Sequence, residues 1–247
     1  MMWEHLKQEQ KDKYKTLITN FASLSEAFSQ KAEGEDSDDR ESYVAPIVNS
    51  KFQETVFQKA FHAVGEDIAN TSYDASVVVD EQHKYLVGIK SFGLDSGDQK
   101  IAQFKKDSQS WNELLSEIRF QADISPDKET ADKENRARYE KLAREIAALR
   151  NQRIESSKAL IKGFHSDASH VEAVYHVLMP TSKGHKPQIH VGETTYLPVD
   201  LDNLKILGST TKNNPTNFRF TDGQHDYKYT AADSQLHMTF RNKEIVV

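Results

Sequence analysis

Apolar residues in the first half of the chain recur mainly at the three- and four-residue spacing of amphipathic helices. This pattern predicts helical segments over residues 3–28, 50–61 and 101–118. Ser50 is a suitable N-cap for the second helix, and Glu54 lies near one edge of its apolar stripe. Pro126 ends the helical pattern that follows.

Two short runs rich in β-branched residues, 75–79 and 85–89, follow the second predicted helix. The five residues between them, 80–84, are all polar. A polar connection of this length between two β-type runs predicts a β-hairpin.

The second half of the chain changes from helical to β-type patterning. Residues 128–164 are rich in Glu, Lys, Arg and Ala with apolar residues at helical spacing, which predicts one long helix. Its interleaved charges are typical of a solvated helix with internal ion pairs, and its apolar seam is alternatively a surface that pairs two protomers, which we favour. We therefore predict three segments, namely a helical N-terminus with the core (1–125), a long helix (126–164) and a β-rich part (165–247) that recognises DNA or completes the core.

Composition narrows the chemistry that the chain can perform. It contains no cysteine, so any metal must be held by oxygen or imidazole. No apolar run approaches the length of a membrane span, and the N-terminus lacks the pattern of a signal peptide, so we expect a cytoplasmic protein without a membrane partner. The net charge of -6 argues little against nucleic-acid binding, because residues 158–247 carry 10 Lys and Arg against 9 Asp and Glu.

The stretch with the clearest chemical pattern runs from Asn49 to Lys106. A helix bearing Glu54 precedes the first β-type run, Asp74 stands directly before that run, and Lys90 directly follows the second. This order resembles the catalytic core of the PD-(D/E)XK nucleases, which include many type II restriction endonucleases. The resemblance covers about a quarter of the chain and implies an α/β (α+β) fold with a restriction-endonuclease-like core, preceded by helices and followed by a long helical insertion and a β-rich module.

The resemblance implies that Asp74 and the Ile89 carbonyl bind Mg²⁺ while Lys90 lies near the attacking water. Mg²⁺ prefers hard oxygen ligands, keeps several waters and needs only one or two carboxylates beside a phosphate. It polarises the phosphate and lowers the pKa of bound water. A neighbouring lysine adds positive charge that orients this water and offsets phosphoryl charge.

The sequence departs from the family pattern at two positions. Tyr73 stands where the family often has proline, and Gly88 stands where its second acid is expected. Because glycine has no side chain to bind metal, we expect Glu54 on the preceding helix to supply this acid. Glu81 in the predicted turn is the alternative.

Further candidates lie outside this pair of runs. Gln103 resembles a glutamine that some family members carry on the helix after the lysine strand, where it contacts DNA or positions the site; a solvated helix face is the other interpretation. The candidate DNA-binding residues are Ser91, Lys105, Lys106, Lys212, Asn214, Arg219 and Lys228. Strand-end hydrogen bonding, a solubilising helix surface and ordinary polar loops explain the same residues without DNA.

The sequence thus predicts a Mg²⁺-dependent endodeoxyribonuclease that cuts double-stranded DNA, as a site-specific type II restriction enzyme acting as a homodimer. The alternative is a non-catalytic DNA-binding or assembly protein built on a decayed nuclease fold, which the glycine at position 88 favours.

Overall fold

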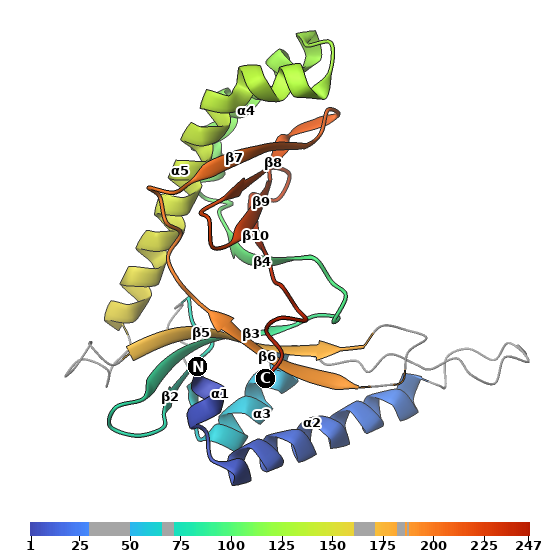
Figure 1. The fold of residues 1–247 in the computed structure, drawn as a ribbon, viewed down its shortest axis with the longest axis vertical. Coiled ribbons are helices and arrows are strands. Elements are labelled where there is room, and N and C mark those ends of the chain that lie inside the picture. The colour runs from blue at the N-terminus through green and yellow to red at the C-terminus, as the bar shows by residue number, and fades with distance from the viewer. Residues whose placement is uncertain (30–49, 66–71, 161–170, 182–185, 187) are drawn as a thin grey trace, which may run out of the picture. The chain divides into compact units, whose positions relative to one another are not determined.

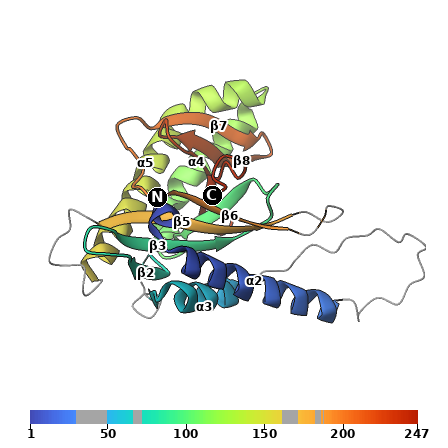
Figure 2. The ribbon, with the colours of Figure 1, turned by 60° about the horizontal axis from the view of Figure 1, so that its bottom comes forward.

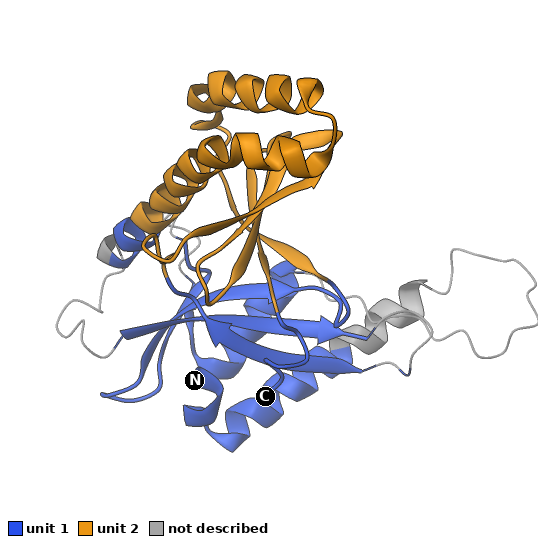
Figure 3. Cartoon of the chain, turned by 45° about the horizontal axis from the view of Figure 1, so that its top comes forward, with its two compact units in different colours: residues 1–96, 154–197, 241–247 blue, residues 97–153, 198–240 orange. Residues whose placement is uncertain are grey.

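The computed structural model describes the chain in six ranges, which are 1–29, 50–65, 72–160, 171–181, 186 and 188–247. The chain forms two compact units that are both discontinuous in sequence (Figure 3). Unit 1 comprises residues 1–96, 154–197 and 241–247, and unit 2 comprises residues 97–153 and 198–240. The fold therefore mixes helices and strands in both units, in agreement with the predicted α+β class.

Unit 1 is built on a five-stranded mixed sheet in the order β1-β2-β3-β5-β6 (Figure 1). Its elements are α1 (Met2–His5), α2 (Gln8–Ser29), α3 (Ser50–Phe61), β1 (Val64–Gly65), β2 (Ala75–Val78), β3 (Lys84–Ser91), β5 (Val171–Pro180) and β6 (Ile189–Thr195). Strands β1, β2 and β3 pair antiparallel, β5 joins β3 in parallel, and β6 returns antiparallel.

The predicted hairpin is confirmed as β2 and β3, which pair with Ala75 opposite Val87. Asp80 closes the turn because its carboxylate accepts hydrogen bonds from the backbone N–H groups of Gln82 and His83. These bonds satisfy turn donors that have no strand partner, as Asx turns commonly do.

The three N-terminal helices cover one face of this sheet, and α2 and α3 run beneath the strands in Figure 2. Phe57 and Phe61 of α3 pack there with Val87 and Ile89 of β3. The same core encloses His176, which makes a 3.0 Å hydrogen bond to the Tyr14 hydroxyl. These contacts anchor the N-terminal helices to the strands by apolar burial and one buried polar network.

Unit 2 contains an all-antiparallel sheet in the order β4-β10-β9-β8-β7. Its elements are β4 (Asp98–Gln103), the 3-10 turn η2 (Ser108–Trp111), α4 (Asn112–Ile124), most of α5 (Lys128–Leu160), β7 (Lys205–Thr211), β8 (Asn214–Thr221), β9 (Asp226–Thr230) and β10 (Gln235–Thr239). Asp127, directly before α5, stabilises the first turn of this helix, because its carboxylate accepts a hydrogen bond from the Thr130 N–H at 2.8 Å.

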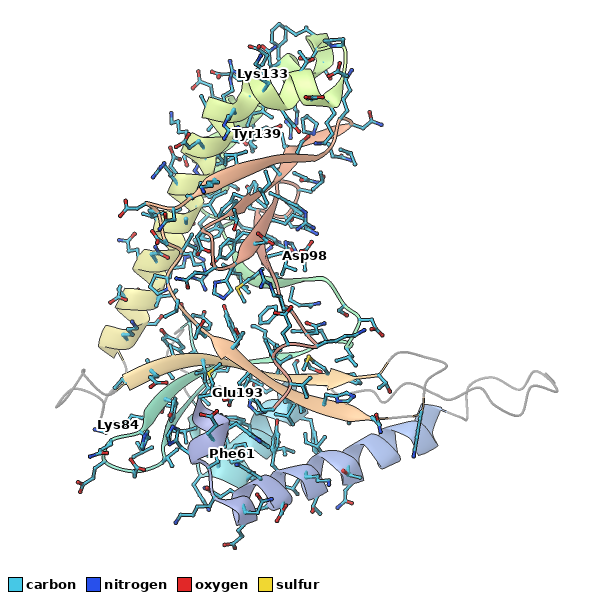
Figure 4. The ribbon with its side chains drawn as sticks, viewed as in Figure 1. Phe61, Lys84, Asp98, Lys133, Tyr139 and Glu193 are labelled. Atoms are coloured by element: carbon cyan, nitrogen blue, oxygen red, sulfur yellow. The ribbon has the colours of Figure 1, made fainter. Side chains whose placement is uncertain are left out.

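The long helix is confirmed as α5 over Lys128–Leu160; the predicted residues 161–164 lie outside the described ranges. Its apolar seam packs within the chain rather than on a second protomer. Tyr139, which is fully buried, stacks on Phe218 of β8 with ring centroids 5.0 Å apart and donates its hydroxyl to the Pro215 carbonyl (Figure 4). The proposed pairing of protomers through this seam was therefore wrong, because its side chains already fill the core of unit 2.

Three features of the predicted layout need correction. The helix expected from residue 101 starts only at Asn112, because residues 98–103 form β4 and pair with β10 far along the chain. The predicted loop 212–217 is reduced to a tight turn, since Asn214 already begins β8. The β-rich part 165–247 is shared between the units, with β5 and β6 completing the sheet of unit 1.

Among the described helices, none combines the length and apolar character required to cross a membrane.

Candidate functional site

Asp74 stands directly before β2 and binds β3 at two points. Its N–H donates to the Val87 carbonyl at 2.9 Å, and its Oδ2 accepts the Ile89 N–H at 2.6 Å. The two bonds lie on either side of Gly88, the position at which the nuclease resemblance predicts an acid. The carboxylate of the half-buried Asp74 is thus held beside the Gly88–Ile89 peptide, at the end of the hairpin opposite its turn.

The Ile89 carbonyl points toward the same side of β3 as Asp74. In a β-strand the N–H and C=O of one residue project toward the same neighbour. Because the Ile89 N–H is bound by Asp74, its carbonyl oxygen faces the region into which β2 does not extend. A carboxylate has about four lone-pair positions, so Asp74 and this carbonyl present hard oxygen donors in one place.

Lys90 follows Ile89 near the end of β3 and is half-buried. Its carbonyl accepts a 3.0 Å hydrogen bond from the side-chain amide of Gln53 on α3. Gln53 is fully buried, so this bond fixes the backbone of the lysine to the helix beneath the sheet. Gln53 was not among the predicted site residues, but its spacing indicates this role: it lies on the same helical stripe as Phe57 and Ala60, where a buried polar group needs a partner.

Gly88 packs against two tyrosine rings on the sheet face opposite the N-terminal helices. A Cβ atom at this position would lie 2.9 Å from the Tyr196 ring and 3.0 Å from the Tyr175 ring. These rings are themselves in contact, with centroids 4.0 Å apart, and leave no room for a side chain. The glycine that replaces the expected acid is therefore explained by close aromatic packing.

The two residues considered as replacements for this acid occupy different places. Glu54 is half-buried on α3, next to Gln53, and α3 contacts both β2 and β3. Glu81 is exposed in the turn between β2 and β3, so the four residues of β2 separate it from Asp74. Four residues of extended strand span about 13 Å, which places Glu81 out of reach of a shared ion.

The described residues include no cluster of three or more His, Asp or Glu side chains suited to a metal ion. Mg²⁺ is commonly held by one or two carboxylates with waters and substrate oxygens, so the donors that fit it here are the Asp74 carboxylate and the Ile89 carbonyl. No family model, curated protein or solved structure matches this chain. The geometry around Asp74 is therefore the main observation that bears on function.

The other residues predicted near the site lie in different settings. Ser91 is the last residue of β3 and is half-buried. Gln103 lies at the end of β4, not on a helix, and its amide donates to the Asp233 carbonyl at 3.0 Å. Lys105 and Lys106 are exposed in the turn after β4, so the helical setting predicted for them was wrong as well.

The four candidates in the C-terminal part of the chain all belong to unit 2. Lys212 donates to the carbonyls of Ser125 and Pro126 at 2.8 and 3.0 Å, which satisfies acceptors just beyond α4. Asn214 bonds the Thr211 hydroxyl across the β7–β8 turn. The remaining pair, Arg219 and Lys228, both bind Asp98.

Proposed function

We propose that this chain is a Mg²⁺-dependent endodeoxyribonuclease that hydrolyses phosphodiester bonds of double-stranded DNA. We further propose that it cuts at specific sites as a type II restriction enzyme does, and acts as a homodimer in the cytoplasm. The observation that carries the proposal is the 2.6 Å bond between the Asp74 carboxylate and the Ile89 N–H, which brings the predicted acid next to the predicted lysine strand.

The donor set beside Ile89 suits Mg²⁺ because it consists of a carboxylate and a backbone carbonyl. Asp74 and Ile89 would hold the ion, and Glu54 on α3 is the proposed second acid. When bound, Mg²⁺ supplies Lewis-acid polarisation of a phosphate oxygen and lowers the pKa of a coordinated water.

The protein groups perform the remaining work. Lys90 is half-buried near the end of β3. Its ammonium would supply a positive charge that offsets the negative charge gained by the phosphoryl group and that orients the attacking water. Gln53 positions Lys90 indirectly by holding its carbonyl. The hairpin and α3 are regular elements, so they fix these groups more rigidly than a loop would.

A cleavage assay with a matched pair of lysine variants tests this proposal. The purified protein is incubated with a large phage DNA and Mg²⁺, with EDTA as the metal-free control, and the products are separated on a gel. We expect discrete bands from the wild type and from Lys84→Ala, but none from Lys90→Ala. Lys84 is a suitable control because it is a half-buried lysine at the other end of the same strand.

The alternative, a non-catalytic DNA-binding or assembly protein on a decayed nuclease fold, is favoured by one observation. The Tyr175 and Tyr196 rings exclude any side chain from position 88 and with it the expected acid. Wild-type protein that binds the duplex but leaves it intact in Mg²⁺ would support this alternative and contradict the nuclease. A smear that requires Lys90 would retain the nuclease and reject site-specific cutting.

A further inference from the structure

Four basic residues stand side by side across the sheet of unit 2. The strand registers pair Arg219 of β8 with Lys228 of β9, Lys228 with His237 of β10, and His237 with Lys100 of β4. Directly paired residues in an antiparallel sheet project to the same face. Arg219, Lys228, His237 and Lys100 therefore form a continuous line, here called the basic row.

The basic row lies on the face of the sheet that does not form the apolar core. The residues that alternate with it point to the other face and are buried: Phe218, Phe220, Tyr227, Tyr229, Leu236 and Met238. The side chains of Arg219 and Lys228 retain 38% and 24% exposure, and Lys100 is exposed. A polar ligand can thus reach the cations without opening the core.

Like charges on directly opposed strand positions destabilise a sheet, and one carboxylate offsets part of this cost. Asp98 accepts Arg219 Nη1 and Nη2 at 3.1 and 2.5 Å and Thr239 Oγ1 at 2.7 Å, and its Oδ2 lies 2.8 Å from Lys228 Nζ. Burial by itself would raise the pKa of Asp98, but these hydrogen bonds outweigh it and hold the pKa well below its usual range. The carboxylate is therefore a fixed negative charge within the row.

The row keeps an excess of positive charge after this compensation. Three permanent cations face one carboxylate, and burial together with Lys228 lowers the pKa of His237. Two residues further along β8, Thr221 pairs with both Lys205 and Asp226. The opposite charges of these two residues cancel in the local sum, so they leave the excess positive charge of the row unchanged. Clustered like charges, which local rules of sheet stability disfavour, are expected more often at functional surfaces.

We propose that the basic row binds the phosphate backbone of the DNA duplex that the chain acts on; this inference rests on the proposed nuclease function. Adjacent strands are about 4.8 Å apart, so the four positions extend over about 14 Å. Duplex DNA carries one negative charge per about 1.7 Å of its axis, so several phosphates fall within reach. Asp98 holds Arg219 and Lys228 in place, and both retain N–H donors that it does not use.

Binding measured without cleavage tests the row separately from the active site. The full-length protein in EDTA is titrated into a short fluorescently labelled duplex, and the anisotropy is followed at several salt concentrations. We expect Lys100→Ala to weaken binding three- to tenfold and to reduce the slope of log K against log salt by about one, as loss of one phosphate contact does. Lys133→Ala is the matched control, because Lys133 is an exposed lysine of the same chain on α5, away from Asp98 (Figure 4).

Reversal of the charge at position 100 is a second test that does not disturb the buried core. Lys100 is exposed, so Lys100→Glu is expected to fold as the wild type does and to weaken binding further than the alanine variant. Unchanged affinity and salt slope in both variants would overturn the proposal, as would equal losses in Lys133→Ala. Equal competition by single-stranded RNA would overturn the assignment to duplex DNA.

The binding and cleavage assays together distinguish failure of the basic-row proposal from failure of the nuclease proposal. Row variants that lose binding in a protein that never cleaves DNA would retain the basic row and reject the nuclease. A wild-type enzyme that cleaves, with row variants that bind as well as it does, would retain the nuclease and reject the row.

Discussion

The Asp74 carboxylate accepts the backbone N–H of Ile89 across the open end of the β2–β3 hairpin. This single bond joins the residue before β2 to the residue before Lys90, which are 15 positions apart in the sequence. Hydrogen bonds to an ionised carboxylate are among the stronger ones in proteins, so it also fixes the direction in which the side chain points. The bond places Asp74 next to Ile89 and Lys90. Substitutions at Gly88 and Gln53, which contact the same part of β3, test this arrangement.

Gly88→Ala is expected to destabilise the protein by about 1–3 kcal/mol, the usual penalty for overpacking a filled core. The added Cβ would approach the Tyr196 and Tyr175 rings to 2.9 and 3.0 Å. Gly97→Ala is the control, because a Cβ there has no neighbour within 4 Å. Urea unfolding of the three proteins measures the difference, and equal midpoints for all three would contradict the packing described for position 88.

Gln53→Ala is expected to lower the free energy of unfolding by about 1–3 kcal/mol, because it leaves the Lys90 carbonyl without its side-chain donor. Gln58→Ala, on the same helix but only half-buried, is expected to cost less. If Gln53 also positions the lysine, its variant will lose cleavage rate under conditions in which it remains folded. A variant with full stability and full activity would show that the Gln53 bond is dispensable.

The pH dependence of stability is expected to carry a contribution from Asp98. Its pKa in the folded protein is held below the ordinary value of about 3.9, because the bonds from Arg219, Lys228 and Thr239 outweigh burial. Between the folded and unfolded pKa values the unfolded chain binds the proton and the folded chain does not, so stability falls as the pH falls through this window. The stabilisation is fully present above about pH 4.

Urea unfolding between neutral pH and pH 3 measures this contribution. The difference in free energy of unfolding between wild type and Asp98→Asn should be largest near neutral pH and should shrink below about pH 4. Asp233→Asn is the control, because it removes an exposed carboxylate of the same unit and leaves the ion pairs of Asp98 in place. A difference that does not change with pH would mean that the ion pairs of Asp98 contribute nothing to folding.

Local sequence patterns predicted the parts of the fold that depend on local interactions. The hairpin followed from two β-branched runs and a polar turn, and α3 and α5 followed from the spacing of residues such as Phe57 and Tyr139. The proximity of Asp74 to the end of β3 could also be predicted, because hairpin pairing fixes which residues meet.

Features that depend on distant pairing could not be predicted in this way. Ile101 and Phe104 begin an apolar spacing that predicts a helix, but β10 pairs with residues 98–103 and makes them a strand. The same long-range pairing moves Gln103 off a helix and aligns Lys100 with His237. Neither the basic row nor its Asp98 partner is visible until these registers are known, because its members come from four separate strands.

The most direct test of the central claim is Mg²⁺-dependent cleavage of DNA by Asp74→Asn. Asparagine can still accept the Ile89 N–H through its side-chain oxygen, so the variant keeps the hairpin bond and loses only the negative charge. Asp95→Asn, in the exposed turn after β3, is the matched control. We predict at least a hundredfold loss of cleavage rate in Asp74→Asn and no loss in Asp95→Asn. A loss of this size is on the order of that seen when a catalytic group is removed. Equal rates in wild type, Asp74→Asn and Asp95→Asn would contradict the assignment of Asp74 to the active site.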